Sequence, residues 1–305
     1  MRKVIVFGSL NMDLSIESDR LPLEGETIFG RNFIVNAGGK GANQAVAAAK
    51  MGAEVHMVGA VGGDLFGDHL IASLAETGVG CEYVTRCENV ATGVAVIIRC
   101  KGDNRIILGA GANLCPTAHD AACAIEELAQ PKDIFLTQLE CDFDETLGAL
   151  RYAHEKGLYT VINPAPACEL PAEIYHSIDM LVVNETECEL LTGIYPADEH
   201  ACRCALQLFC DRGVETVIIT LGERGSILQS ADQTLVSIPP TVNAVDTTCA
   251  GDTYIGAMVA AHTRACSLDE AMELATNASA LTTTTVGAQQ SIPHLEDVPR
   301  PQCFV

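Results

Sequence analysis

Residues suited to phosphoryl transfer are concentrated in the run Val245-Asp-Thr-Thr-Cys-Ala-Gly-Asp252. This run leads into an apolar stretch that predicts a helix over Ala250–Thr263. The first N–H groups of a helix have no partner within it, so those around Ala250 and Gly251 could bind an anion. Asp252, beside this anion hole, could accept the proton of a hydroxyl group that attacks a phosphoryl group. The alternative is that Asp252 only caps the helix.

A second glycine-rich segment, Asn36-Ala-Gly-Gly-Lys-Gly-Ala-Asn43, leads into an Ala-rich helix. It is not a Walker A phosphate loop, because Gly41 follows Lys40 at the position where Ser or Thr would coordinate magnesium. Lys40 and Asn43 beside several glycines favour a polar, neutral ligand, since small residues let a ligand approach the backbone. A purely structural turn is the alternative.

Two further polar segments follow apolar strands. The segment Thr220-Leu-Gly-Glu-Arg-Gly225 joins a hydroxyl to a glycine turn whose N–H groups could bind phosphate oxygens. An ordinary turn would have the same composition. The segment Asn184-Glu-Thr-Glu187 heads a helix, where its acids complement the helix dipole. Near a nucleotide they could also bind Mg²⁺ through water.

The composition excludes several classes of partner. Forty Asp and Glu residues against 18 Lys and Arg give a formal net charge of −22, which repels nucleic acid and anionic lipid. No stretch approaches the roughly 18 apolar residues of a membrane span. Asn11 and Asp13 interrupt the apolar run near the N-terminus, so we expect a cytoplasmic protein without a signal peptide. The 14 Cys residues show neither CxxC nor zinc-ligand spacing, and we expect them to be reduced, buried thiols.

The elements that position these motifs alternate along the chain. We expect strands at Val4–Leu10, His56–Val61, Asp133–Leu139, Tyr159–Asn163, Met180–Val183 and Thr216–Leu221. We expect helices at Asn43–Met51, Phe66–Thr77, Thr117–Ala129, Asp144–Lys156, Ala201–Arg212, Ala250–Thr263 and Leu268–Thr283. This alternation predicts an α/β fold with a mainly parallel sheet and helices on both faces. Ligands of such sheets bind beyond the carboxyl ends of the strands, where the polar segments lie.

Two segments interrupt the alternation. Residues 14–35 mix charged residues with single apolar ones, and residues 92–108 form two β runs joined at Lys101-Gly102-Asp103. We expect these segments together to form a small antiparallel flap, with a plain surface hairpin as the alternative. Residues 1–13, 36–91 and 109–305 would then form the core.

The order and spacing of these segments resemble those of the ribokinase (PfkB) family of carbohydrate kinases over nearly the whole chain. The motifs are Gly8-Ser-Leu-Asn11-Met-Asp13, Gly38-Gly-Lys-Gly-Ala-Asn43, Gly62-Gly-Asp-Leu-Phe-Gly67, Asp246–Asp252 and Gly287-Ala-Gln-Gln-Ser-Ile-Pro293. Further stretches resemble members that act on ribose: Gly111-Ala-Asn113, Gln138-Leu-Glu140, Asn163-Pro-Ala-Pro166 and Asn184–Gly193. The resemblance implies a ribokinase-like three-layer α/β/α fold, a small β-sheet lid and a homodimer.

The resemblance further implies ATP-dependent phosphorylation of D-ribose at its 5-hydroxyl group, with Asp252 as the base and Ala250 and Gly251 as the anion hole. The implied sugar-binding residues are Asn11, Asp13, Gly39, Lys40, Gly41, Asn43, Glu140 and Asp252. The implied ATP-binding residues are Asn184, Thr220, Gly222, Gly225, Gly251, Thr276 and Asn277, and Glu187 would hold Mg²⁺ through water. An activating K⁺ would lie at Asp246, Thr248, Thr282, Thr285, Gly287 and Ser291, mostly on backbone carbonyls; a packed loop without an ion is the alternative.

Cys249 departs from the family pattern, which usually has Gly at the start of its GAGD motif. A positive φ there would make a β-carbon costly, and a helix N-terminus would lower the pKa of the thiol and make it reactive. Two other functions stay open. The first is a family kinase for deoxyribose, another sugar or a nucleoside such as adenosine, for which Asp13 should discriminate by reading adjacent hydroxyls. The second is a non-catalytic sugar-binding regulator.

Overall fold

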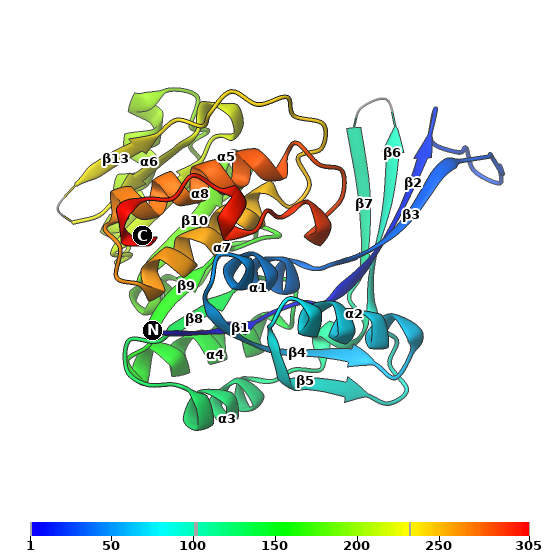
Figure 1. The fold of residues 1–305 in the computed structure, drawn as a ribbon, viewed down its shortest axis with the longest axis horizontal. Coiled ribbons are helices and arrows are strands. Elements are labelled where there is room, and N and C mark those ends of the chain that lie inside the picture. The colour runs from blue at the N-terminus through cyan, green and yellow to red at the C-terminus, as the bar shows by residue number, and fades with distance from the viewer. Residues whose placement is uncertain (1, 101–102, 232, 305) are drawn as a thin grey trace.

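A nine-stranded sheet forms the centre of the computed structural model, which describes residues 2–100, 103–231 and 233–304 (Figure 1). Its strand order is β13-β12-β11-β10-β9-β8-β1-β4-β5. The strands are β1 (Lys3–Phe7), β4 (Glu54–Gly62), β5 (Gly80–Cys87), β8 (Ile134–Thr137), β9 (Tyr159–Ile162), β10 (Met180–Asn184), β11 (Thr216–Thr220), β12 (Ser226–Gln229) and β13 (Thr234–Ser237). All neighbours from β11 to β5 pair in parallel, and β12 and β13 add an antiparallel edge. The expected mainly parallel sheet is confirmed.

Both faces of this sheet are buried, which explains the continuous apolar runs of its strands. In β1, Val4 and Val6 join one hydrophobic cluster, whereas Ile5 and Phe7 join another. Successive side chains of a strand point to opposite faces, so the clusters lie on the two sides of the sheet.

Helices form the outer two layers. One cluster includes residues of α1 (Lys40–Lys50), α2 (Leu65–Glu76), α7 (Ala250–Thr263) and α8 (Leu268–Thr282). The other includes residues of α3 (Ala118–Leu128), α4 (Phe143–Glu155), α5 (Glu185–Thr192) and α6 (Glu199–Asp211). The result is the expected three-layer α/β/α architecture (Figure 1).

A second sheet of four strands projects from this body (Figure 1). Its order is β3-β2-β6-β7, with β2 at Asn11–Ser18, β3 at Arg31–Gly38, β6 at Gly93–Cys100 and β7 at Asp103–Gly109. The expectation of an antiparallel flap was wrong for one pair, because β2 and β6 run parallel. These two strands are joined through core elements rather than by a hairpin, and such a crossover allows the parallel direction. Lys101 and Gly102 of the expected turn lie outside the described residues.

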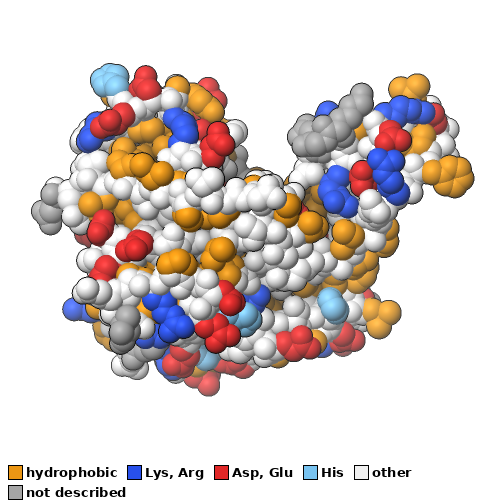
Figure 2. Space-filling view, turned by 45° about the horizontal axis from the view of Figure 1, so that its top comes forward, with side chains coloured by type: hydrophobic (Ala, Val, Ile, Leu, Met, Phe, Trp, Pro, Cys, Tyr) orange, Lys and Arg blue, Asp and Glu red, His pale blue; other side chains and the backbone are white. Residues whose placement is uncertain are grey.

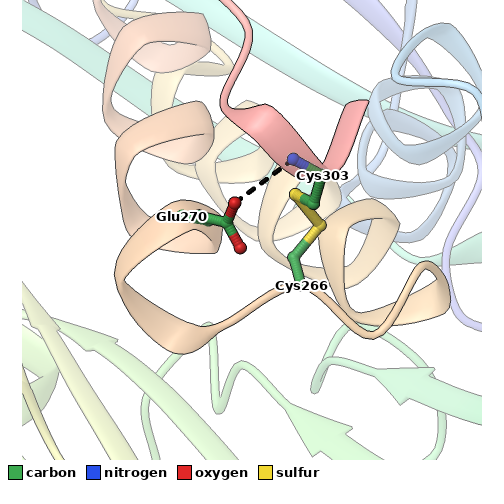
Figure 3. Close-up of side chains that lie close together, drawn as sticks. All are labelled: Cys266, Glu270 and Cys303. Carbon is green, nitrogen blue, oxygen red and sulfur yellow. Dashed lines mark hydrogen bonds between the residues drawn. A yellow bond between two sulfur atoms is a disulfide. The ribbon is translucent and has the colours of Figure 1, made fainter. Parts of the chain in front are cut away.

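The C-terminal segment folds back onto the turn between α7 and α8. Cys266 in this turn and Cys303 form a disulfide, and Glu270 accepts a hydrogen bond from the backbone N–H of Cys303 at 3.2 Å (Figure 3). The expectation that all cysteines are reduced was therefore wrong for this pair. The two residues are 37 positions apart, and only the return of the chain brings their Cα atoms to 5.6 Å. Of the helices described, none is long and apolar enough to cross a membrane.

Candidate active site

The glycines at the start of α1 allow this helix to begin directly against the end of β1. A β-carbon on Gly41 would lie 2.6 Å from the carbonyl carbon of Gly8, and one on Gly39 would lie 2.7 Å from the backbone nitrogen of Asn11. Gly39 also has a φ of 90°, which favours glycine. These two glycines therefore bring the N-terminus of α1 close to the β1–β2 turn.

Polar groups from three parts of the chain meet at this turn. Glu140, which follows β8, accepts hydrogen bonds from Ser9 Oγ at 2.6 Å, from Asn11 Nδ2 at 3.2 Å and from the backbone N–H of Lys40 at 3.1 Å. Asn113 was not among the predicted site residues, yet its Nδ2 donates to Asn11 Oδ1 at 2.7 Å. We call Asn11, Asp13, Lys40, Asn43, Glu140 and Asp252, whose side chains were predicted to bind sugar, the sugar-site cluster.

This cluster concentrates negative charge. Burial, with the carboxylates of Glu140 and Asp252, raises the pKa of Asp13 to about 7. Burial alone would lower the pKa of Lys40, but nearby carboxylates, Asp252 foremost, raise it. Three carboxyl groups against one ammonium group thus leave the cluster with an excess of negative charge, which favours a neutral ligand rich in hydroxyl donors over an anionic one.

Asp252 lies in the first turn of α7 and is buried. Its Oδ2 accepts from Asn43 Nδ2 at 3.0 Å, and its Oδ1 accepts from Gln44 Nε2 at 2.9 Å. The N-cap of α7 is Cys249, and no side chain caps this helix. Both carboxylate oxygens are thus held by amides of α1, and Asp252 does not serve as the helix cap.

Cys249 has a φ of 67°, which is uncommon for a residue with a β-carbon. Burial, and then the carboxylates of Asp252 and Asp13, raise the pKa of this thiol well above its usual range. The expectation of a lowered pKa was wrong, because burial and the nearby carboxylates disfavour the thiolate more than the helix terminus favours it.

A pocket of about 780 Å³ lies on the other side of this helix terminus. Its lining includes six residues that were predicted to bind ATP or to form the anion hole: Thr220, Gly222, Gly225, Ala250, Gly251 and Thr276. Asn184 and Asn277 are not in the lining. The lining also includes residues that were not among those predicted to bind ATP, such as Tyr254, Pro239, Pro240, Ser279, Ala280 and Thr283. Ser279 and Ala280 of α8 and its C-cap Thr283 follow at helical spacing from Thr276, a periodicity that could have revealed them.

Asn184 and Glu187 form a capping box at the start of α5. Glu187 Oε2 accepts from the backbone N–H of Asn184 at 2.9 Å and from Asn163 Nδ2 at 3.2 Å. Burial raises the pKa of Glu187, although these hydrogen bonds and the charge of Lys40 oppose the shift. The box fixes the carboxylate at the carboxyl end of β10.

Asp246 joins two loops near the N-terminus of α7. Its carboxylate accepts from the backbone N–H of Thr248 at 2.9 Å and from that of Gly287 at 3.0 Å. Burial opposes ionisation, but these hydrogen bonds lower the pKa of Asp246. The hydroxyl of Thr282 donates to Ala278 O, and that of Ser291 donates to Ala288 O. The loops of the predicted ion site are thus adjacent, with some of their hydroxyls already bound to protein.

Comparison with known proteins identifies the family of the chain. The chain matches the pfkB family of carbohydrate kinases over residues 1–295. It is 38% identical over 295 residues to a ribokinase of Haemophilus influenzae, with 96% of each chain covered. It is 36% identical over 297 residues to a deoxyribokinase of Salmonella typhi, again with 96% of each covered. A solved structure of Arabidopsis thaliana ribokinase complexed with ribose and ATP superimposes with a TM-score of 0.88 at 32% identity, covering 97% of this chain and 96% of that one.

The chain belongs to the pfkB family of carbohydrate kinases. It is therefore an enzyme that transfers a phosphoryl group to an alcohol acceptor.

Proposed function

We propose that this enzyme transfers the γ-phosphoryl group of ATP to the 5-hydroxyl group of D-ribose. The observation that carries the proposal is the place of the α7 N-terminus between two sites. Ala250 and Gly251 line the pocket, while Asp252 is hydrogen-bonded to Asn43 of the sugar-site cluster. A hydroxyl group next to Asp252 would therefore also be next to the end of a phosphate chain bound in the pocket.

The residues divide the chemistry between them. Asn11, Asp13, Lys40 and Glu140 would bind the other hydroxyl groups and orient the sugar, as a neutral polyol requires. Asp252 would accept the proton of the attacking hydroxyl group. The N–H groups at Ala250 and Gly251 would stabilise the charge on the transferred group. Gly39 and Gly41 would contribute by letting α1 approach.

The pocket would hold ATP. The phosphates of ATP would lie near Thr220, Gly222 and Gly225. Its adenine ring would lie beside Thr276, with Asn184 and Asn277 at the margin of the pocket. The carboxylate of Glu187 suits Mg²⁺, because its hydrogen bonds fix it in place and its oxygen can hold the ion through a water molecule. Mg²⁺ supplies charge neutralisation on the transferred phosphoryl group.

The two loops joined by Asp246 fit a K⁺ ion. The hydroxyl groups of Thr282 and Ser291 donate to protein, and backbone carbonyl oxygens of these loops would suit a weakly hydrated cation. The residues that would hold it are Asp246, Thr248, Thr282, Thr285, Gly287 and Ser291. The positive charge would stabilise the loop that precedes the anion hole.

The second sheet would act as a lid and as the surface of a homodimer. Its strands carry the exposed apolar side chains of Phe33, Ile106 and Ile107, with exposed fractions of 61%, 58% and 67%, and Phe29, between β2 and β3, is also fully exposed. Figure 2 shows hydrophobic side chains on this projecting part and a hollow between it and the body. Pairing two such sheets would cover the apolar residues of one face, because apolar patches of this kind are typical of interfaces. We place the enzyme in the cytoplasm, where ATP is available.

A substrate panel tests the proposal. Phosphorylation of ribose, 2-deoxyribose, fructose and adenosine should be compared, with and without K⁺. We expect ribose to be preferred and K⁺ to increase the rate. Preference for 2-deoxyribose would indicate a deoxyribokinase, like the Salmonella relative. If folded protein phosphorylates none of these compounds, a non-catalytic sugar-binding regulator would be favoured. Sedimentation at the mass of one chain would contradict the dimer.

Replacing Asp252, the proposed general base, tests the mechanism. We expect Asp252→Asn to lower kcat by about 10²–10⁴-fold, because general-base assistance is lost. Ribose affinity should change little, since Asn retains an oxygen and an amide of the same size. Turnover within about tenfold of the wild-type rate would contradict the role of Asp252.

A further inference from the structure

A chain of buried amides joins Asp252 to Glu187. Gln44 in α1 is fully buried, and its Nε2 donates to Asp252 Oδ1 at 2.9 Å and to Asn163 Oδ1 at 3.4 Å. Asn163, which follows β9, donates from Nδ2 to Glu187 Oε2 at 3.2 Å. Gln138, which follows β8, donates from Nε2 to Gln44 Oε1 at 2.7 Å. The side-chain amides of Gln44 and Asn163 therefore connect the two carboxylates, and Gln138 branches from Gln44.

Groups that only accept hydrogen bonds set the direction of every amide. The backbone carbonyl of Val182 and the carboxylate of Glu187 accept from Asn163 Nδ2 at 3.0 Å and 3.2 Å, so Asn163 turns its NH₂ group to them and its oxygen to Gln44. Gln44 must then present its NH₂ group to both Asn163 and Asp252. Its oxygen is left for Gln138, which has to donate. A flipped Gln44 would place its oxygen against the carboxylate of Asp252.

Gln138 remains in this arrangement although one of its own atoms is left unpaired. Its Oε1 is buried and, among the described residues, has no hydrogen-bond partner. A β-carbon on Gly8 would lie 2.3 Å from this oxygen, so only glycine leaves room for it. Burying an unpaired oxygen costs free energy. The donation to Gln44 offsets part of this cost, and apolar packing would avoid it altogether.

We propose that Gln44, oriented by Gln138, is the positioning residue that sets the carboxylate of Asp252 for proton transfer. This inference rests on the proposed function, in which Asp252 is the base. Asn43 and Gln44 hold one oxygen each, so rotation of the carboxylate is blocked on both sides. A free carboxylate could turn away from the hydroxyl group, and a misplacement of about 1 Å can cost about 10²-fold in rate.

Two substitutions of Gln44 test the inference. Gln44→Met keeps the length of the side chain and removes both its donor and its acceptor. We expect kcat to fall by about 10²-fold, with the Kd for ribose changed by less than about threefold. Gln44→Glu places a second carboxylate against Asp252. Like charges disfavour ionisation, so the acid limb of the kcat profile should move to higher pH by about one unit or more.

The controls separate positioning from folding. Gln207→Met makes the same change on the exposed surface of α6 and should leave kcat and its pH profile unchanged. Gln138→Met should lower kcat in the wild-type background but add little to Gln44→Met, because its effect passes through Gln44. Thermal unfolding of each variant shows that it is folded under the assay conditions.

The outcomes distinguish this inference from the proposed function. Full kcat in folded Gln44→Met, with an inactive Asp252→Asn, would overturn the positioning role alone. An unshifted pH profile in Gln44→Glu would also overturn it, as would equal losses from Gln138→Met in both backgrounds. Near wild-type turnover by Asp252→Asn would instead remove the base, and with it the function on which the inference rests.

Discussion

Replacing Asp13 by Asn should stabilise the ligand-free enzyme at alkaline pH while weakening its binding of sugar. Asp13 lies beside the carboxylates of Glu140 and Asp252, and burial together with their charge raises its pKa to about 7 from the reference value of 3.8. None of the residues that the structure describes donates a hydrogen bond to its carboxylate. The ionised form of Asp13 is therefore less favourable in the folded protein than in the unfolded chain.

The sign of the pH dependence follows from linkage. Between pH 3.8 and about 7 the unfolded chain releases the proton of Asp13 while the folded protein retains it, so stability falls as pH rises. At 1.36 kcal/mol per pKa unit, the loss is about 2 kcal/mol at about pH 5.5 and about 4 kcal/mol at about pH 8.5. Asn cannot ionise, so Asp13→Asn should recover these amounts.

Urea unfolding of wild type and variant at the two pH values measures the effect. The gain in the free energy of unfolding should be larger by about 2 kcal/mol at the higher pH. Asp297→Asn, at an exposed carboxylate of the C-terminal segment, is the matched control and should show no such pH dependence. A gain equal at both pH values, or no gain, would refute the reasoning.

Sugar binding should change in the opposite direction. Hydrogen bonds to a charged group contribute about 1.5–3 kcal/mol, so Asp13→Asn should weaken ribose binding by about ten- to hundredfold. Calorimetric titration with ribose measures this loss. Unchanged affinity would remove Asp13 from the sugar site.

Two predictions concern cysteines. The disulfide between Cys266 and Cys303 closes a loop with a sequence separation of 37, so Cys303→Ser should lower the free energy of unfolding by up to about 4 kcal/mol. Wild type treated with dithiothreitol should show the same lowered melting temperature, and equal melting of oxidised and reduced protein would contradict a stabilising disulfide. Cys249 should react slowly with thiol reagents at pH 8, because burial and nearby carboxylates raise its pKa. Stoichiometric labelling of Cys249 in folded protein, as fast as in urea, would contradict this.

The buried elements of the fold could be predicted from local patterns. The helix expected at Ala250–Thr263 is confirmed with the same bounds, and the one expected at Thr117–Ala129 has these two residues as its caps. Strands β5, β12 and β13, at the two ends of the sheet order, were missed. Strands β5 and β13 are only partly buried, and β12 has two adjacent apolar residues, Ile227 and Leu228, so neither a long apolar run nor a regular alternation marks them.

The residues of the site also divide into those that the sequence revealed and those that it did not. The polar segments at Asn36–Asn43, Asn184–Glu187 and Val245–Asp252 stand out by composition, because they follow strands or open helices where backbone groups are free. Asn113 and Gln138 escaped notice as site residues, although both lie in stretches quoted for their resemblance to the family. Single amides carry no local signal, and their importance comes from partners about 100 positions away.

By itself, the sequence determined the alternation of buried strands with amphipathic helices, the order of the motifs and the position of Asp252 at the start of a helix. Each of these depends on residues that are neighbours in the chain, where side-chain periodicity and helix-end chemistry act. Only the tertiary structure decided that Asp13 lies near the carboxylates of Glu140 and Asp252, that these two also act on Lys40, and that Gln44 is hydrogen-bonded to Asp252. Charge interactions and hydrogen bonds depend on distances in space, and packing sets those distances between residues that are far apart in the sequence.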